Sequence, residues 1–419
     1  MSAAPRVDLL SFGCRLNIVE SEAMRREALR SGQLDLTIVN TCAVTAEAVR
    51  QSRQAVRRAR AAHPTGRLVI TGCAAEIDPV GFGAMPGVDA ILPNRVKADP
   101  ASWPMDEGAS PEADGASGGP SLGGRSHSRG FVEVQNGCDH RCTFCVIPLG
   151  RGASRSVTPD TVVSRIRALV EEGAREVVLT GVDVTSYGGD LASGLRLGNL
   201  LAHVLRAVPE LPRLRLSSLD CIEADPALLD LVATEPRLMP HLHVSLQSGS
   251  DLILKRMKRR HGRSDAIAFC RTLRALRPEI VFGADLIAGF PTEDEAMFAD
   301  TLDLIEACGI TYVHAFSYSQ RPGTPAARMP PVPGDVARDR GRRLREAGER
   351  RLGQHLEGMV GRTVEVLTER GGTGRAPDFT LVRLPPETPP GLLQPATLCG
   401  HDGRVAIADT AASGLRRPA

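Results

Sequence analysis

Aromatic residues and lysines are scarce in this chain of 419 residues. Only 3% of the residues are Phe, Trp or Tyr, and only three of the 51 basic residues are Lys, at positions 97, 255 and 258. A binding surface built mainly from stacked aromatic rings is therefore disfavoured. Arginine carries almost all the positive charge; it offers planar, bidentate contacts to phosphate, although a GC-rich genome would produce the same bias without a function.

Long hydrophobic runs are also missing. No segment approaches the ~18–20 uncharged apolar residues that a membrane helix needs, and the first residues contain no apolar stretch before a small-residue cleavage site. We therefore expect a cytoplasmic protein with no signal peptide and no membrane partner. The hydrophobic fraction of 42% and the charged fraction of 24% are ordinary for a globular protein, and the length predicts about three domains.

One segment divides the chain. Residues 98–124 consist mostly of Ala, Ser, Gly and Pro, with five acidic and no basic residues, which is typical of a flexible connector. We place an N-terminal domain at 1–97 and the linker at 98–128. Within the N-terminal domain, β-type runs at 7–13, 34–41, 67–72 and 88–92 alternate with helical patterns at about 17–31 and 44–62. This alternation predicts a small parallel α/β sheet.

The same alternation continues after the linker. Residues 129–357 are expected to form a partial barrel of six strand-helix units, and residues 358–419, which have short β-type runs and no helical period, a small all-β barrel. The six strands are predicted at 131–135, 176–181, 213–218, 241–247, 280–287 and 310–319. The overall class is α/β with a terminal all-β module.

Three cysteines lie close together after the first strand of the predicted barrel. Cys138, Cys142 and Cys145 have the spacing CxxxCxxC, and three thiolates in one loop suit a 4Fe-4S cluster whose fourth iron stays open to another ligand. A zinc site is the alternative, but structural zinc normally takes four protein ligands. His140, inside the loop, is a competing ligand.

A second group of three cysteines is dispersed in the sequence. Cys14, Cys42 and Cys73 each follow a predicted strand of the N-terminal sheet. Because the carboxyl ends of neighbouring parallel strands meet at one edge, we expect these thiols to converge on a second site; burial as small hydrophobic residues is the alternative. Cys270 and Cys308 are expected in the core, Cys221 is expected to be structural, and Cys399 has no assigned chemistry.

Polar residues also end the predicted strands of the barrel. They are candidates for cofactor or substrate contacts, although local turn and cap chemistry is a competing explanation: Thr180, Gly181, Asp183, Ser217, Ser218, Gln247 and Asp285. His241 and His243 share one face of their strand and are expected to pack in the barrel interior.

Basic residues form two local clusters. Residues 251–280 contain nine Lys or Arg against three Asp or Glu, and residues 50–67 contain six Arg and no acid. Such clusters supply the phosphate contacts of nucleic-acid binding, although a solvated helix face has the same pattern. The first cluster gives the candidate RNA-binding residues Lys255, Arg256, Lys258, Arg259 and Arg260.

These motifs resemble a known family. The CxxxCxxC loop with Phe144 before its last cysteine resembles the radical S-adenosylmethionine (SAM) enzymes, and the settings Phe12-Gly13-Cys14, Asn40-Thr41-Cys42 and Thr71-Gly72-Cys73 are similar to the methylthiotransferase branch. Further matching stretches are 151–156, 179–183, 216–218, 246–250 and 256–260. Ala153, Val157 and Ser245 depart from residues that the family often has.

The resemblance implies a specific reaction. Two 4Fe-4S clusters and SAM would insert sulfur and a methyl group at C2 of a modified adenosine through a 5′-deoxyadenosyl radical. The branch that acts on N6-threonylcarbamoyladenosine next to the tRNA anticodon is the most similar, and the terminal module resembles its RNA-binding TRAM domain. An external electron donor is implied, and the sulfur donor is left open. Alternatives are isopentenyladenosine tRNA, a ribosomal-protein aspartate, and a non-catalytic iron-sulfur RNA-binding or sensor protein.

Overall fold

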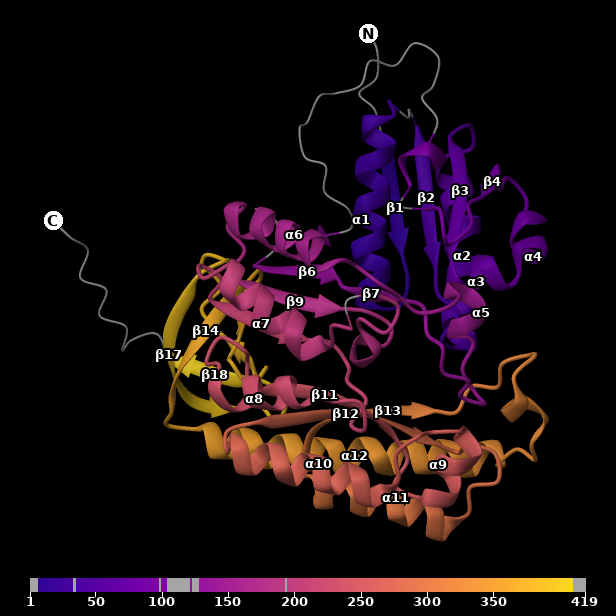
Figure 1. Ribbon diagram of the computed structural model, residues 1–419. Helices are drawn as coiled ribbons and strands as arrows, with labels where there is room; N and C mark the ends of the chain where they lie inside the picture. The colour runs from indigo at the N-terminus through magenta and orange to yellow at the C-terminus, as the bar shows by residue number, and fades with distance from the viewer. Residues whose placement is uncertain are drawn as a thin grey trace, which may run out of the picture.

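The computed structural model describes residues 7–32, 35–97, 99–103, 121–122, 128–192 and 194–409. Its N-terminal part is a four-stranded parallel sheet in the order β1-β2-β3-β4 (Figure 1). The strands are β1 (Val7–Ser11), β2 (Leu36–Thr41), β3 (Arg67–Gly72) and β4 (Ala90–Ile91), and the helices are α1 (Arg15–Arg30), α2 (Ala46–Ala62), α3 (Cys73–Ile77) and α4 (Pro79–Gly83).

Alternating strand residues cover the two faces of this sheet. Ile38 packs with Met24 of α1, whereas its neighbour Val39 packs with Val56 of α2 and Phe82 of α4. Side chains of successive strand residues point to opposite faces, so α1 and α2 bury different sides of the same sheet. The predicted parallel α/β domain is confirmed.

Six parallel strands form the central barrel, and each lies where the sequence predicts it. They pair in two groups of three, which two isolated parallel bridges connect, Leu214 with Leu238 and Leu219 with Val244. The first group is β6 (Arg129–Glu133), β9 (Glu176–Thr180) and β10 (Arg213–Leu216), and the second is β11 (His241–Gln247), β12 (Val281–Ala288) and β13 (Ile310–Ser317). The barrel is open, as expected from six units.

Helices cover the outside of the central barrel (Figure 1). Its helices are α5 (Ile147–Arg151), α6 (Pro159–Glu171), α7 (Leu197–Ala207), α8 (Pro226–Thr234), α9 (Asp251–Met257), α10 (Arg263–Leu276), α11 (Glu295–Cys308) and the long α12 (Gly334–Met359). The two-residue strands β7 (Gln135–Asn136) and β8 (Arg155–Ser156) pair antiparallel as a hairpin whose long connection, residues 137–154, contains α5. Single 3-10 turns lie at Pro100–Ser102, Val184–Ser186 and Pro325–Arg328.

The barrel interior is polar. In β10, Leu214 and Leu216 belong to the large apolar core, whereas the alternate residues Arg213 and Arg215 are buried and paired with Glu176 of β9. In β11, His241 and His243 line a cavity inside the barrel, as the two-residue period predicts. The outward faces of the strands therefore supply the hydrophobic core, and the inward faces supply charge.

A closed five-stranded barrel follows α12. It consists of β14 (Thr363–Glu369), β15 (Thr373–Arg375), β16 (Leu381–Arg383), β17 (Leu393–His401) and β18 (Ala406–Asp409). Arg215 of the central barrel donates to the carbonyl oxygens of Ala376 and Pro377 at 2.9 and 2.8 Å. The small all-β module predicted at the C-terminus is confirmed, and it docks against the amino end of the central strands.

Most of the predicted linker lies outside the described residues. At its end, β5 (Ser121–Leu122) pairs antiparallel with β6, so this part of the segment extends the sheet. The exact domain boundaries stay predictions. Among the described residues, no helix has the length and apolarity required to span a bilayer.

Candidate active site

The three N-terminal cysteines lie at one edge of the sheet. Cys14 precedes α1, Cys42 directly follows β2, and Cys73 begins α3 directly after β3. Gly13 has a φ of +95°, and a Cβ placed on it would lie 2.5 Å from the Cys42 Sγ. The chain before Cys14 therefore packs directly on Cys42, which requires a glycine at position 13.

Buried side chains hold these loops in place. The Asn17 side chain donates to the Phe12 carbonyl at 2.6 Å, and the Asn40 side chain donates to the Asn17 carbonyl at 3.0 Å. The Thr41 hydroxyl donates to the Thr71 carbonyl at 2.7 Å. These hydrogen bonds connect the segments beside the three cysteines to one another, which fixes the edge of the sheet.

The second cysteine group lies in the loop after β7. The Cys138 amide donates to the Gly152 carbonyl at 3.1 Å, and the Thr143 amide and hydroxyl donate to the carbonyls of Met257 and Arg256 at 3.1 and 2.8 Å. Phe144 packs edge-on against Phe290, with ring centroids 6.3 Å apart. The loop is therefore attached at both ends and in the middle.

The surroundings of this loop suit ligation by thiolates. Burial raises the pKa of Cys138 to about 12 and that of Cys145 to about 11, so these thiols need a bound cation in order to ionise near neutral pH. The Arg259 guanidinium lies 3.7 Å from the Cys142 Sγ and adds positive charge. Three thiols in a partly buried, cationic loop fit a 4Fe-4S cluster.

His140 has other partners. Its Nε2 lies 2.7 Å from an Asp183 oxygen and 3.5 Å from a Glu223 oxygen, and hydrogen bonds to these carboxylates raise its pKa to about 10. The side chains of Cys138, His140 and Asp183 each offer one atom that could bind a metal, and these three atoms lie within 4.8 Å of one another. Asp183, predicted as a cofactor contact, thus lies beside the loop and engages His140.

Arg151 joins the two cysteine groups. It ends α5, which follows Cys145, and it donates to Glu20 at 2.8 Å and to the Asn17 side chain at 2.5 Å, both on α1. Glu20 also pairs with Lys97 at 2.6 Å, and all three charged side chains are buried.

Close packing around Cys73 reinforces this junction. A Cβ on Gly150 of α5 would lie 3.0 Å from the Cys73 Cβ, and the Asn94 side chain donates to the Gly150 carbonyl at 2.5 Å while lying 3.6 Å from the Cys73 Sγ. The loop with Cys145 and the loop with Cys73 are therefore neighbours, and the two sheets meet at their carboxyl edges.

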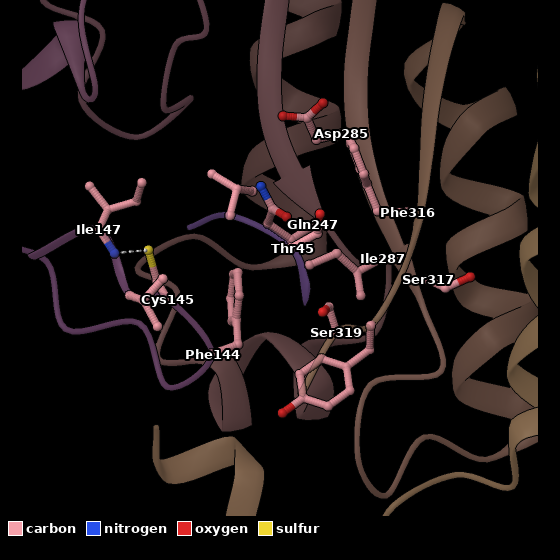
Figure 2. A pocket seen from close by; sticks show the side chains of 13 residues that line it. Thr45, Phe144, Cys145, Ile147, Gln247, Asp285, Ile287, Phe316, Ser317 and Ser319 are labelled. Carbon is pink, nitrogen blue, oxygen red and sulfur yellow. Dashed lines mark hydrogen bonds between the residues drawn. The ribbon is translucent and has the colours of Figure 1, made fainter. Parts of the chain in front are cut away.

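A cavity of about 200 Å³ lies beside Cys145, and Figure 2 shows the side chains that line it. Cys145 and Phe144 lie on one side of it, and Gln247, Asp285 and Phe316 lie on the other. Gln247 has a φ of +70°, next to a shift in the β11-β12 register, and this unusual backbone places its side chain at the cavity.

A larger cavity of about 630 Å³ lies next to the first and shares Asp285 and Phe316 with it. It is bounded by the start of α1, the interior of the central barrel and the terminal barrel. The candidate residues that line it are Thr180, Gly181, Ser217, Ser218 and Asp285. Of the predicted cofactor contacts, only Asp183 lines neither cavity.

Histidines surround Asp285 in the larger cavity. His243 and His314 lie 3.3 and 3.5 Å from its carboxylate, and the Ser218 hydroxyl lies 2.8 Å from the His243 Nδ1. Burial opposes ionisation of Asp285, but the two histidines outweigh it and lower its pKa. Burial lowers the pKa of His241, and the positive charges of Arg215 and His243 lower it further, so the His241 ring is neutral.

The candidate RNA-binding residues have different surroundings. Lys255 and Lys258 are exposed, and among the described residues neither forms an ion pair. Arg259 pairs with Asp220 at 2.9 Å, and Arg260 pairs with Glu223 at 2.5 Å. Arg256 is half-buried and donates to the Thr292 carbonyl at 3.2 Å. Contact with RNA stays a prediction for all five.

Sequence reasoning missed several residues of the larger cavity. Arg15, His314, Arg375 and Phe379 line it. Arg15 follows Cys14 directly, which is a local signal. Arg375 and Phe379 belong to the terminal barrel, and nothing in their sequence places them in the central one.

The other cysteines are free thiols. Cys270 and Cys308 are fully buried in the apolar core, as predicted, and Cys221 is buried with 7% of its surface exposed. Cys399 is exposed.

Known proteins resemble this chain over most of its length. The Radical SAM superfamily model matches residues 132–305, and the model of the Uncharacterized protein family UPF0004 matches residues 6–92. Threonylcarbamoyladenosine tRNA methylthiotransferase MtaB of Rickettsia prowazekii is 45% identical, covering 90% of this chain and 91% of that protein. A tRNA-2-methylthio-N(6)-dimethylallyladenosine synthase of Cereibacter sphaeroides is 35% identical, covering 89% of each chain.

A solved structure shares the fold. The radical S-adenosylmethionine methyltransferase TsrM of Kitasatospora setae, determined with tryptophan and a SAM analogue, gives a TM-score of 0.52 at 16% identity and covers 75% of this chain and 67% of that chain. At this identity the likeness concerns the fold alone. With two family models matched and relatives similar over about nine-tenths of the sequence, the chain belongs to the radical SAM methylthiotransferase family.

Proposed function

We propose that this protein converts N6-threonylcarbamoyladenosine next to the tRNA anticodon into its 2-methylthio derivative. The observation that carries the proposal is the junction between the two groups of three cysteines, made by Arg151 and Gly150, beside adjoining cavities. The 45% identity to a threonylcarbamoyladenosine enzyme supports the substrate.

Each group of residues has a separate task in this proposal. Cys138, Cys142 and Cys145 hold one 4Fe-4S cluster, and Cys14, Cys42 and Cys73 hold the second. When bound, the clusters and SAM supply the one-electron cleavage of SAM, the sulfur atom and the methyl group.

The remaining residues position the reactants. Gln247 and Asp285 offer polar contacts at the smaller cavity, which Phe144, Ile287 and Phe316 otherwise line with apolar surface. This surface excludes water from the reacting groups. Arg151 keeps the two loops at a fixed distance, because its partners on α1 are buried with it.

The partners follow from the chemistry. The tRNA presents an unstacked adenosine in its anticodon loop, which costs little energy to expose, and the exposed Lys255 and Lys258 are candidate phosphate contacts. A reductant outside this chain supplies the electron, and a separate donor replenishes the sulfur.

The dimethylallyl substrate is the second candidate, because a relative named for that activity is 35% identical over 89% of the chain. The lower identity makes it the weaker choice. A ribosomal-protein substrate and a non-catalytic sensor have no supporting observation here.

Mass spectrometry of tRNA nucleosides tests the proposal. A strain that lacks the gene should lose 2-methylthio-N6-threonylcarbamoyladenosine and accumulate the unthiolated nucleoside, and the wild-type gene should restore it. A Cys138→Ala variant is the matched control and should not. Loss of the 2-methylthio-isopentenyl nucleoside instead would establish the second candidate, and an unchanged nucleoside profile would contradict both.

A further inference from the structure

Two arginines that line the larger cavity form no direct ion pair with a described carboxylate. Arg15 lies at its α1 side and Arg375 at its terminal-barrel side. Both guanidiniums lie over the ring of Phe379, with the central carbons 5.7 and 4.5 Å from the ring centroid. Two cations from opposite ends of the sequence therefore meet at one aromatic ring.

Neither arginine has a carboxylate partner among the described residues. Arg375 donates from Nη1 to the Phe379 carbonyl at 3.1 Å, and its Nε is buried with no acceptor. The Arg15 side chain forms no hydrogen bond or ion pair with any described group, and it lies over the rings of Phe131 and Phe379. The buried Arg375 Nε is a cationic donor without an acceptor, which is costly, and the exposed Arg15 brings a second cation to the same cavity. An anionic ligand would therefore stabilise this region.

Two neighbouring arginines, Arg129 and Arg215, do form ion pairs with carboxylates. Arg129 pairs with Glu176 and, at 3.0 Å, with Glu369; Arg215 pairs with Glu176 at 2.8 Å. Their charge is used to attach the two barrels. The anion-binding capacity of the cavity therefore resides in Arg15 and Arg375.

The cavity also reaches both cysteine groups. Gly13 and Cys14 line it, and the smaller cavity, which shares Asp285 and Phe316, is lined by Cys145. A base held where the cavities adjoin would lie next to both cluster sites. A substituent on that base would then extend toward Arg15, Arg375 and Phe379.

We propose that Arg15 and Arg375 bind the carboxylate of the N6 substituent and thereby select an acidic adenosine over one with an apolar substituent. The proposal rests on the proposed function. A threonylcarbamoyl group ends in a carboxylate, which suits the planar donors of arginine, whereas a dimethylallyl group has no polar atom to pair with either cation.

Binding measurements on the reconstituted holoenzyme test this assignment. Fluorescence anisotropy gives the Kd for three anticodon stem-loops, which carry N6-threonylcarbamoyladenosine, its carboxyl methyl ester, or N6-isopentenyladenosine. In Arg375→Gln we expect the Kd of the first to rise about 10- to 100-fold, with changes below about two-fold for the other two. Arg375→Lys should restore part of the loss.

Arg15→Gln should repeat this pattern, and Arg350→Gln, an exposed position on α12, is the matched control and should change none of the three values. Iron content is measured on each variant, because Arg15 directly follows Cys14. If Arg15→Gln loses iron, its Kd values are set aside and those of Arg375→Gln test the assignment. Equal weakening of all three stem-loops, or weaker SAM binding, would overturn the assignment. If the wild-type enzyme does not methylthiolate the threonylcarbamoyl substrate, the proposed function fails instead.

Discussion

At the scale of single residues, Arg151 connects the loop of the barrel cysteines to helix α1. Its guanidinium and the side chains of Glu20 and Lys97 are each no more than 6% exposed. Burial raises the pKa of a carboxyl group, yet in Glu20 the charges of Lys97 and Arg151 outweigh burial and lower its pKa to about 2. The junction between the two cysteine groups thus depends on an ionised, buried carboxylate.

We expect Arg151→Met to lower the free energy of unfolding by about 3–5 kcal/mol, because it leaves the buried Glu20 with one cation in place of two. Chemical denaturation at pH 7 measures the change. The control is Arg404→Met, which removes an exposed pair with Glu349 and should cost no more than about 1 kcal/mol. Similar losses in both variants would contradict a special role for the buried network.

The same network predicts an acid dependence. Since the folded pKa of Glu20 lies below its ordinary value near 4.5, its contribution is fully present above that pH and is lost as the pH falls toward 2. Between pH 5 and 2, the wild-type protein should therefore lose more stability than Glu20→Gln does. Equal losses, measured by denaturation at each pH, would show that Glu20 is not stabilised by its partners.

At the scale of elements, the hairpin of β7 and β8 positions the loop that carries Cys138, Cys142 and Cys145. Gly137 stands between β7 and Cys138 with a φ of +73°, and a Cβ on it would lie 1.9 Å from the Ala153 carbonyl oxygen. No side chain fits there without moving the hairpin.

Gly137→Ala should therefore displace Cys138, reduce bound iron by about half and abolish SAM cleavage, as measured by iron analysis and formation of 5′-deoxyadenosine. Gly173→Ala is the control that has backbone strain without a steric clash. Gly173 has a φ of +98°, and nothing lies within 4 Å of the position where its Cβ would stand. That control should lose some stability but retain its iron. Full activity in Gly137→Ala would contradict this role of the hairpin.

The end of α9 provides the test of RNA contact. Because Arg259 and Arg260 are paired with Asp220 and Glu223, their removal would also disturb the protein. Lys255→Gln with Lys258→Gln is the cleaner change, and it should weaken tRNA binding and reduce the dependence of log K on log salt by about 1–2. An unchanged slope, measured by titration at several salt concentrations, would exclude this surface.

At the scale of the whole molecule, local sequence patterns predicted the strands and helices. The residues that meet in the larger cavity are instead determined by how the domains pack against one another. The strands that carry Cys14, Cys42 and Cys73, the six strands of the central barrel and the closed terminal barrel follow from periodicity. The meeting of Arg15 with Arg375 does not, because it depends on packing between parts 360 residues apart in sequence. The antiparallel pairing of β5 was missed for a similar reason, since its composition resembles a connector.

The central claim is that two separate clusters face one another across this junction. The most direct measurement is iron and 5′-deoxyadenosine formation in anaerobically reconstituted protein in which Cys14, Cys42 and Cys73 are all changed to Ala. Two 4Fe-4S clusters give about eight irons per chain in the wild type; the variant should retain about half of them and still cleave SAM. Loss of all the iron, or of none, would contradict the two-cluster arrangement.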